Sequence, residues 1–386
     1  MIRLTIPSIQ EDDLQAVREA LASGYLVQGA RVAAFEQAVA SYVGAEFAIA
    51  VSNGTAALHL ALLALDIQPG DIVIAPAYSW ISTANVIELC GAQPVFIDIQ
   101  SDIFNLDPNR LEVSLKRLMT SVETAPRVKA ILPVHTFGQM ASMPAIMELA
   151  GRYNLSVIED AACALGATLQ GRQAGTWGVM GCFSFHPRKA ITTGEGGIIT
   201  TDNPVLVRRV QALRNHGQDP ESPSPNFIKP GFNYRMTEFQ AALGLSQMSK
   251  LDRIVATRQR LVQHYNELLA GTCLQFPVVA EDSQPVYQSY VVLLPEPLVR
   301  QRQAIIQELR ARGIETTIGT LHMPLTTYFS NRYGYQLGDF PMTDTVFARS
   351  LTLPLFEEMQ ESQQQEVVKQ LLTIVQTKLA ETNVSA

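Results

Sequence analysis

Short apolar runs alternate with helical patterns along the first two-thirds of the chain. Each run is rich in β-branched or aromatic residues and is bounded by Gly, Pro, Asn or Asp, which is typical of a buried strand. The predicted strands are residues 47–51, 71–76, 93–99, 128–135, 155–160, 181–185 and 196–201. Helical stretches such as 83–90 and 143–153 lie between them. This alternation predicts an α/β fold whose mainly parallel sheet is covered by helices on both faces.

The pattern changes after about Leu251, where a long amphipathic helix begins. The elements that follow are a strand-like segment and two helices, at 287–296, 299–312 and near 359–380. They predict a smaller α+β domain behind the sheet domain. We therefore expect a large domain at 1–255 and a small C-terminal domain at 256–386, with the boundary known only to the precision of a helix end.

The composition is that of a globular protein with room for two cores, since the 386 residues are 47% hydrophobic and 17% charged. A formal net charge of −7 argues against nucleic acid or an anionic membrane surface as the main partner. The four cysteines show no CxxC pair and no zinc-site spacing, so we expect free thiols and no metal. The longest apolar helix candidate, residues 56–65, is far too short to span a membrane. Because the N-terminus also lacks the order of a signal peptide, we expect a cytoplasmic protein.

Chemically useful side chains follow several of the predicted strands. In an open α/β sheet, ligands bind outside the carboxyl ends of the strands, so these residues are candidates for a common site. They are Ser52, Asn53, Gly54, Thr55, Tyr78, Ser79, Trp80, His135, Glu159, Asp160, His186 and Lys189. The set contains no GxGxxG fingerprint and no metal-ligand spacing.

Four of these residues have an ordinary structural explanation as well as a functional one. Gly54 and Thr55 open a helix, where backbone N–H groups suit a phosphate, but Ser, Asn and Thr are also common helix caps. Asp160 follows a buried strand and could be a partnered functional carboxylate or another cap. Trp80 could be a flat wall for a ring or simply a buried aromatic.

Lys189 lies in "SFHPRKAITTGEGG", between a predicted strand and a glycine-rich turn. A partly desolvated lysine, or one near other positive groups, has a lowered pKa and becomes a nucleophile able to form an imine. The alternative is a solvated lysine in a surface turn.

The strand-end residues together match what pyridoxal phosphate requires of a protein. These requirements are a lysine for an imine, an acid facing the pyridine nitrogen, a phosphate site and a flat wall against the ring. The acid keeps the ring nitrogen protonated, and the lysine serves as the base that moves a proton. Lys189, Asp160, Gly54 with Thr55, and Trp80 are candidates for these parts.

Longer segments carry a family resemblance. "EDAACALGA", "GCFSFHPRKAITTGEGG" and "PGFNYRMTEFQAALGLSQM" resemble the DegT/DnrJ family of pyridoxal-phosphate-dependent sugar aminotransferases, and so do segments along nearly the whole chain. The resemblance implies the fold of a fold-type I aminotransferase, with a large cofactor domain and a small C-terminal domain. It also implies that the N-terminal segment helps to form the pocket.

The resemblance assigns roles to individual residues. It implies that Lys189 forms the imine and acts as general base, and that Asp160 partners the pyridine nitrogen. It implies phosphate contacts from Gly54, Thr55 and Ser184. Trp80 occupies the position of the family's stacking aromatic, and Asn233 would reach the phosphate of the neighbouring subunit. A homodimer with shared active sites follows from that last role.

Two positions depart from the family pattern. Cys163 stands near the cofactor ring where the family commonly has Gln or His, and a thiol is smaller and a poorer hydrogen-bonding group. Gln28 stands where a small hydroxyl residue is common. Relatives that carry histidine in place of the lysine dehydrate the sugar instead, and Lys189 argues against that branch.

The predicted reaction moves an amino group from L-glutamate to a keto carbon of a nucleotide-linked deoxysugar. One alternative is a pyridoxal phosphate aminotransferase acting on a cyclic keto-polyol or a free keto sugar, and another is a non-catalytic regulator that kept the fold. Gln28, Tyr78 and His322 are candidates for substrate contacts. His135 and His186 receive no role.

Overall fold

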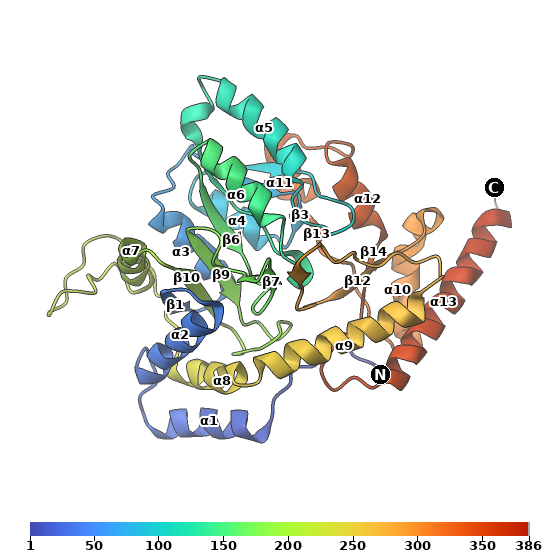
Figure 1. The fold of residues 1–386 in the computed structure, drawn as a ribbon, viewed down its shortest axis with the longest axis horizontal. Coiled ribbons are helices and arrows are strands. Elements are labelled where there is room, and N and C mark those ends of the chain that lie inside the picture. The colour runs from blue at the N-terminus through green and yellow to red at the C-terminus, as the bar shows by residue number, and fades with distance from the viewer. Residues whose placement is uncertain (385–386) are drawn as a thin grey trace.

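A computed structural model describes residues 1–384 and is built around a seven-stranded sheet in the order β1-β10-β9-β6-β5-β2-β4. The strands are β1 (Phe47–Val51), β2 (Ile72–Pro76), β4 (Gln93–Ile97), β5 (Val128–Ile131), β6 (Ser156–Asp160), β9 (Met180–Ser184) and β10 (Gly197–Thr201). All neighbouring pairs are parallel except those of β10 with β1 and β9. The predicted α/β fold with a mainly parallel sheet is therefore confirmed (Figure 1).

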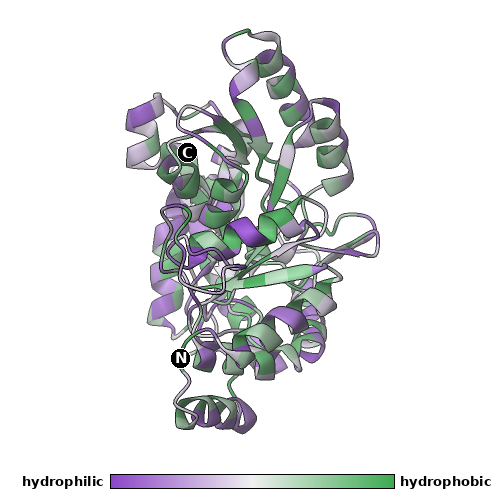
Figure 2. Ribbon diagram, turned by 90° about the vertical axis from the view of Figure 1, so that its left-hand side faces the viewer, coloured by the Kyte–Doolittle hydropathy of each residue, from purple (hydrophilic) through white to green (hydrophobic). Residues whose placement is uncertain are grey.

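Helices cover both faces of this sheet. They are α2 (Ala30–Val43), α3 (Gly54–Ala64), α4 (Ser82–Leu89), α5 (Pro108–Thr120), α6 (Met143–Arg152), α7 (Pro204–Arg214) and α8 (Glu238–Met248). Alternate residues of β2 serve different cores: Ile72 and Ile74 pack with α2, α5, α6 and α8, whereas Val73 and Ala75 pack with α3, α4 and α7. Both faces are apolar for this reason, and hydrophobic residues follow the inner strands (Figure 2).

The C-terminal part forms a second core around an antiparallel strand pair. Its main elements are α9 (Leu251–Leu269), β12 (Tyr290–Leu293), α10 (Arg302–Ala311), β14 (Ser350–Leu353) and α13 (Glu361–Val384). Tyr265, Tyr290, Leu309, Leu353 and Leu371 are among its buried residues. The predicted boundary at residue 255 lies within the continuous helix α9, and the division into domains at that residue stays a prediction.

One C-terminal segment returns to the sheet domain. Strand β13 (Leu321–His322) pairs with β3 (Tyr78–Ser79), and Met323 and Phe329 pack with Phe96 of β4. The short elements are α11 (Thr327–Tyr333), α12 (Pro341–Arg349), β7 (Thr168–Leu169), β8 (Arg172–Gln173) and β11 (Ser283–Gln284), with 3-10 turns at Ala125–Arg127, Thr136–Gly138, Glu296–Gln301 and Met323–Leu325. This return brings residues 317–321 next to the carboxyl ends of the sheet strands.

The N-terminal segment joins both parts of the chain. Helix α1 (Glu11–Ala22) packs along α8, and its Asp12 and Asp13 form ion pairs with Lys250. Before it, the backbone N–H of Ile2 donates to the carbonyl of Gly313 at 2.7 Å. Within residues 1–384, no helix combines the length and apolar character needed to cross a membrane.

Candidate active site

A cavity of about 810 Å³ lies at the carboxyl ends of the parallel strands. Residues that follow β1, β5, β6 and β9 line it, together with β3 and the returning segment 317–321. The residues predicted to bind the cofactor that lie among its walls are Gly54, Thr55, Trp80, Asp160, Cys163, Ser184 and Lys189. These side chains come from separate segments of the sequence and meet because parallel strands end at the same edge of a sheet.

The first turn of α3 opens onto this cavity. The side chain of Asn53 accepts the N–H of Ala56 at 2.8 Å and caps the helix. The N–H groups of Gly54 and Thr55 have no partner inside the helix, because the first turn lacks preceding carbonyls. A Cβ at position 54 would lie 2.8 Å from the Cβ of Ser184, so only glycine permits this approach. Two N–H groups, the helix dipole and a serine hydroxyl thus surround one point, which fits a phosphate.

Asp160 is a buried carboxylate at the end of β6, and only 4% of its surface is exposed. Thr83 Oγ1 donates to Oδ2 at 2.7 Å, and the N–H of Ala162 donates to Oδ1 at 3.2 Å. Burial raises the pKa of this carboxyl, while those two hydrogen bonds and the nearby charge of Lys189 act in the opposite direction. An acid that is buried, oriented and short of a full counter-charge fits a protonated pyridine nitrogen.

Lys189 lies in the turn that follows β9. Its backbone N–H donates to the carbonyl of His186 at 2.8 Å, which closes the turn. Its Nζ donates to Cys163 Sγ at 3.0 Å, so the amine points across the cavity toward the loop after Asp160. Thus the unusual Cys163 directly contacts the predicted nucleophile.

Trp80 has 61% of its surface exposed and lines the cavity just before α4. It is therefore not a core residue, and its indole offers the flat wall that a ring requires. The lysine, acid, phosphate-binding turn and aromatic wall lie on one cavity, so the described residues fit pyridoxal phosphate.

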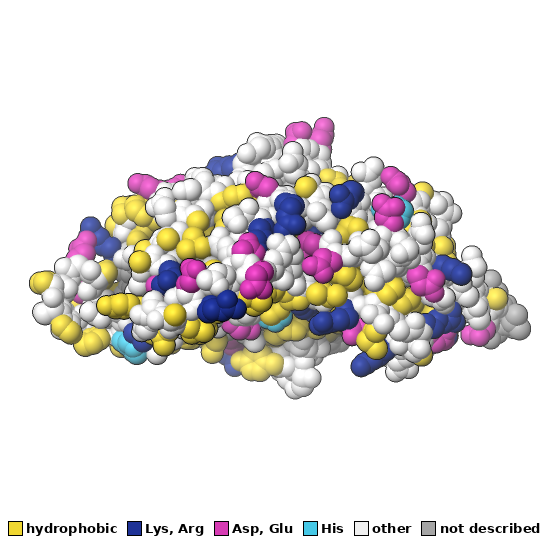
Figure 3. Space-filling view, turned by 90° about the horizontal axis from the view of Figure 1, so that it is seen from below, with side chains coloured by type: hydrophobic (Ala, Val, Ile, Leu, Met, Phe, Trp, Pro, Cys, Tyr) yellow, Lys and Arg dark blue, Asp and Glu magenta, His cyan; other side chains and the backbone are white. Residues whose placement is uncertain are grey.

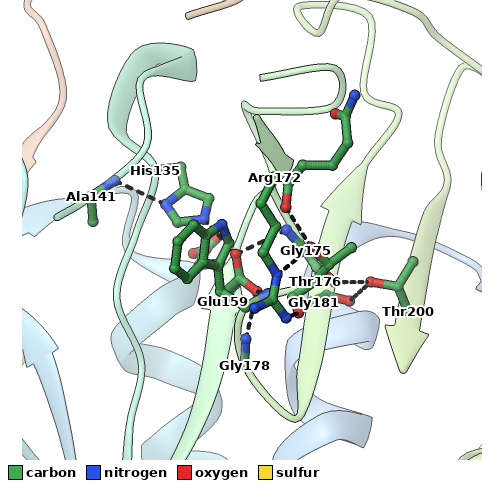
Figure 4. Close-up of polar contacts among 12 residues, drawn as sticks. His135, Ala141, Glu159, Arg172, Gly175, Thr176, Gly178, Gly181 and Thr200 are labelled. Carbon is green, nitrogen blue, oxygen red and sulfur yellow. Dashed lines mark hydrogen bonds and ion pairs between the residues drawn. The ribbon is translucent and has the colours of Figure 1, made fainter. Parts of the chain in front are cut away.

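Glu159, the neighbour of Asp160, is not among the cavity walls, and its polar contacts fix the scaffold (Figure 4). It accepts hydrogen bonds from the backbone N–H groups of Gly175, Trp177 and Gly178 at 2.6–2.9 Å. His135 Nε2 also lies 2.8 Å from its carboxylate, and His135 Nδ1 accepts the N–H of Ala141 at 3.2 Å. The proton of the neutral ring is therefore on Nε2 and is donated to Glu159. Together, His135 and Glu159 hold the segment before β9, so His135 has a structural role.

The predicted substrate residues lie outside the cavity walls described for this chain. Tyr78 is fully buried; its hydroxyl lies 3.1 Å from Ser350 Oγ and accepts the N–H of Thr320 at 3.1 Å. His322 is buried with its Nε2 2.8 Å from Asp344 Oδ1. Gln28 is half-buried in a left-handed conformation with φ 46°.

Asn233 is exposed and lies outside those walls, whereas its neighbour Tyr234 contributes to them. The rings of Phe232 and Tyr234 stack at a centroid distance of 4.8 Å and both contact the ring of His59. In this extended segment the aromatic residues point inward and Asn233 points outward, as expected for side chains that alternate.

Several cavity residues were not identified from the sequence. They are His59, Arg188, Glu195, Tyr234, Gln288 and residues 317–321. Arg188 and Glu195 lie within the lysine segment and could have been found there. Gln288 and 317–321 reach the site only through tertiary packing, for which the local sequence carries no signal.

Comparison with known proteins agrees with the site. A sequence model of the DegT/DnrJ/EryC1/StrS aminotransferase family matches residues 7–372. A GDP-perosamine synthase from Caulobacter vibrioides is 42% identical over 318 residues, which cover 82% of this chain and 83% of the relative.

Two solved structures are similar over nearly their whole length. One is the PLP form of a Streptococcus pneumoniae protein named as a sugar aminotransferase, with TM-score 0.90 and 27% identity over 97% of this chain and 99% of that one. The other is Helicobacter pylori PseC, an aminotransferase of pseudoaminic acid biosynthesis, with TM-score 0.90 and 25% identity over 97% and 99%. Within the part of the chain that the structure describes, no cluster of His, Cys, Asp or Glu could hold a metal ion. With its fold, its lysine site and a family match over most of its length, this chain belongs to the DegT/DnrJ/EryC1/StrS aminotransferase family.

Proposed function

We propose that this aminotransferase moves an amino group from L-glutamate to a keto carbon of a nucleotide-linked deoxysugar, with pyridoxal phosphate as its cofactor. The observation that carries the proposal is the convergence of Lys189, Asp160 and the first turn of α3 on one cavity. The 42% identity to a GDP-perosamine synthase supports a nucleotide-linked sugar as the acceptor. Solved PLP and PMP forms of a similar protein support the cofactor.

Each residue would have a distinct task. When bound, pyridoxal phosphate supplies an electron sink for the charge left by breaking a bond to the substrate's α carbon. The N–H groups of Gly54 and Thr55 and the hydroxyl of Ser184 would hold its phosphate. Asp160 would hold a proton on its ring nitrogen, and Trp80 would cover one face of the ring.

The proton transfer would fall to Lys189. Its Nζ would accept the proton released from the α carbon of the amino donor and return a proton in the reverse half-reaction. Cys163 Sγ accepts a hydrogen bond from this amine at 3.0 Å, which supports a role in orienting it beside the cofactor. The same lysine would serve the donor and the acceptor in turn, so one cavity must accommodate both.

We propose a homodimer in which Asn233 completes the site of the neighbouring subunit. The exposed, outward-facing position of Asn233 supports this role. Exposed hydrophobic residues, namely Leu21, Tyr25, Leu26, Val27, Phe227 and Ile228, supply apolar surface for an interface. Hydrophobic side chains also lie among charged ones on the face that carries α1 (Figure 3).

The four free cysteines support a reducing, cytoplasmic location.

A spectroscopic experiment tests the proposal in two steps. The purified protein, loaded with pyridoxal phosphate, should be yellow, and borohydride should attach a pyridoxyl group to the peptide that contains Lys189, as mass spectrometry would detect. Lys189→Ala should give no such adduct. L-glutamate should then bleach the yellow protein, and a GDP-linked keto-deoxysugar should restore the colour.

The possible outcomes separate the alternatives. A free keto sugar or keto-polyol that restores the colour faster than the nucleotide sugar would favour the second enzyme function. A yellow protein that glutamate leaves unchanged would favour a regulator. No adduct on Lys189 after loading would refute the proposed cofactor site.

A further inference from the structure

The turn between Phe185 and Lys189 carries two side chains, His186 and Arg188, that line the cavity and have no role in the proposed reaction. Several hydrogen bonds fix this turn. The N–H of Lys189 donates to the carbonyl of His186 at 2.8 Å, and that of Arg188 donates to His186 Nδ1 at 3.2 Å. From the opposite wall, Gln288 Nε2 donates to the carbonyl of Arg188 at 2.9 Å. The backbone of Arg188 is thus held on both sides.

His186 presents a hydrogen-bond donor from this turn. Because its Nδ1 accepts a hydrogen bond from Arg188, the proton of the neutral ring is on Nε2. Burial lowers the pKa of His186, which keeps the ring neutral at pH 7, although the charge of Glu195 acts in the opposite direction. Among the described residues, none accepts a hydrogen bond from this Nε2.

Arg188 presents a guanidinium without a protein partner. It is exposed, and its hydrogen bonds to described residues involve only its backbone. Some arginines of the chain are engaged by acids: Arg214 pairs with Glu36 at 2.6 Å, and Arg258 pairs with Glu357 at 2.7 Å. An unpaired guanidinium on a cavity wall is available to an anionic ligand.

The charges around the cavity leave room for such an anion. Its described walls contain two cations, Arg188 and Lys189, and two acids, Asp160 and Glu195. Asp160 accepts hydrogen bonds from Thr83 and Ala162, and in the proposed reaction its charge is matched by the protonated ring nitrogen of the cofactor. The charge of Glu195 acts on the pKa of His186. Glu195 forms no ion pair with the guanidinium of Arg188. A carboxylate or phosphate beside Arg188 would therefore add a favourable charge pair.

The geometry points to an anion-binding subsite, formed by the Arg188 guanidinium and the His186 Nε2–H, that holds a carboxylate or phosphate group of a substrate. This inference rests on the proposed function, in which the donor has two carboxylates and the acceptor a diphosphate. A guanidinium binds either group through two parallel hydrogen bonds, whereas an ammonium acts as a point charge. Arg188 would then help to select anionic substrates and orient them relative to Lys189.

Binding measurements on the cofactor-loaded enzyme test the subsite without relying on turnover. Glutarate serves as an unreactive dicarboxylate for the donor arm, and GDP serves as the probe for the acceptor arm, with dissociation constants from calorimetry. Arg188→Gln should weaken at least one probe about tenfold or more, and Arg188→Lys should weaken it less. His186→Gln should have a smaller effect on the same probe.

A matched control separates this effect from a general loss of positive charge. Arg310 in α10 is also an exposed arginine, and no described residue pairs with its side chain. Arg310→Gln should leave both dissociation constants within about twofold, because Arg310 is not among the cavity walls and salt screens its charge.

The outcomes are decisive. A loss confined to glutarate assigns the subsite to the amino donor, and a loss confined to GDP assigns it to the acceptor. Unchanged binding of both probes to loaded Arg188→Gln would overturn the inference; if that variant does not load, unchanged binding to the likewise uncharged Arg188→Met would do so. A wild-type protein that forms no adduct on Lys189 would instead refute the proposed function, so the two failures can be told apart.

Discussion

Replacing Asp160 with asparagine should separate the catalytic role of this residue from its effect on the fold. The substitution keeps the shape of the side chain and removes its charge. In the unliganded protein, the carboxylate is buried and receives hydrogen bonds from Thr83 and Ala162. The asparagine oxygen can accept the N–H of Ala162. Thr83 can then accept from the new amide and donate to Ser79, whose hydroxyl lies 3.0 Å away.

The expected change in stability is small and favourable. Hydrogen bonds to a charged group contribute about 1.5–3 kcal/mol and neutral ones about 0.5–1.5 kcal/mol. Replacing the two hydrogen bonds to the carboxylate by two to a neutral amide therefore costs about 2–3 kcal/mol. Burying a carboxylate costs several kcal/mol, and the raised pKa of Asp160 indicates that this burial cost exceeds the stabilisation from its partners. We therefore expect unliganded Asp160→Asn to be at least as stable as wild type near neutral pH.

The pH dependence of this difference has a definite sign. The folded pKa of Asp160 lies above its ordinary value of 3.8, so the folded protein binds the proton more tightly than the unfolded chain. Its contribution to stability is complete below pH 3.8 and is lost as the pH rises through the folded pKa. The advantage of Asp160→Asn should thus be largest near neutral pH and shrink as the pH falls toward 4, which urea unfolding of both unliganded proteins would measure.

The same variant should lose most of its activity. Removing one partner of a buried ion pair costs about 3–5 kcal/mol, which corresponds to a loss of about 10²–10⁴-fold in the rate of the glutamate half-reaction. Stopped-flow bleaching of the yellow protein measures this rate, and the borohydride adduct confirms that the cofactor is loaded. A variant that unfolds more easily at pH 7 and reacts at the wild-type rate would refute both parts of the reasoning.

Two further substitutions test the phosphate site and the dimer. Gly54→Ala places a Cβ 2.8 Å from the Cβ of Ser184, so cofactor affinity should fall about tenfold or more in a titration of visible absorbance. The cofactor-free form should also become less stable by about 1–2 kcal/mol, because the clash with Ser184 outweighs the helix preference of alanine. Unchanged affinity would contradict the phosphate site. Co-expression of Lys189→Ala with Asn233→Ala should restore roughly a quarter of the sites if Asn233 acts across a dimer. Activity no greater than that of the separate variants would show that Asn233 does not serve the neighbouring subunit's site.

The elements that local sequence determines were predicted well. Each sheet strand is a short buried run between turn residues, and the rule for strand ends brought Gly54, Asp160 and Lys189 to one edge. Thr83, which orients Asp160, was not identified, because a threonine in a helix has no distinctive pattern. Residues 317–321 reach the cavity through the pairing of β13 with β3, which connects positions more than two hundred residues apart. Such contacts depend on the packed fold and are not visible in a local pattern.

Tyr78 and Trp80 show that a position after a strand does not by itself reveal whether a residue lines the site. Both follow β2 and both are aromatic, so composition does not distinguish them. Tyr78 lies in β3 and is buried by the pairing with β13, while Trp80, two residues later, is exposed on the cavity. The pairing partner of β3 decides which aromatic residue supports the wall and which one forms it.

At the end of β6, one residue faces the cavity and the residue before it holds the surrounding backbone. Asp160 faces the cavity, while Glu159 receives the N–H groups of 175–178 on the opposite side and fixes the segment that leads into β9. Side chains alternate along an extended segment, so each strand end supplies one group to the cavity and its neighbour to the scaffold. Ser184 is the last residue of β9 and Lys189 follows it, so the positions of both depend on Glu159. Asp160 is the functional acid, and its neighbour Glu159 positions Ser184 and Lys189. They can be adjacent in sequence because successive side chains of a pleated strand point to opposite sides.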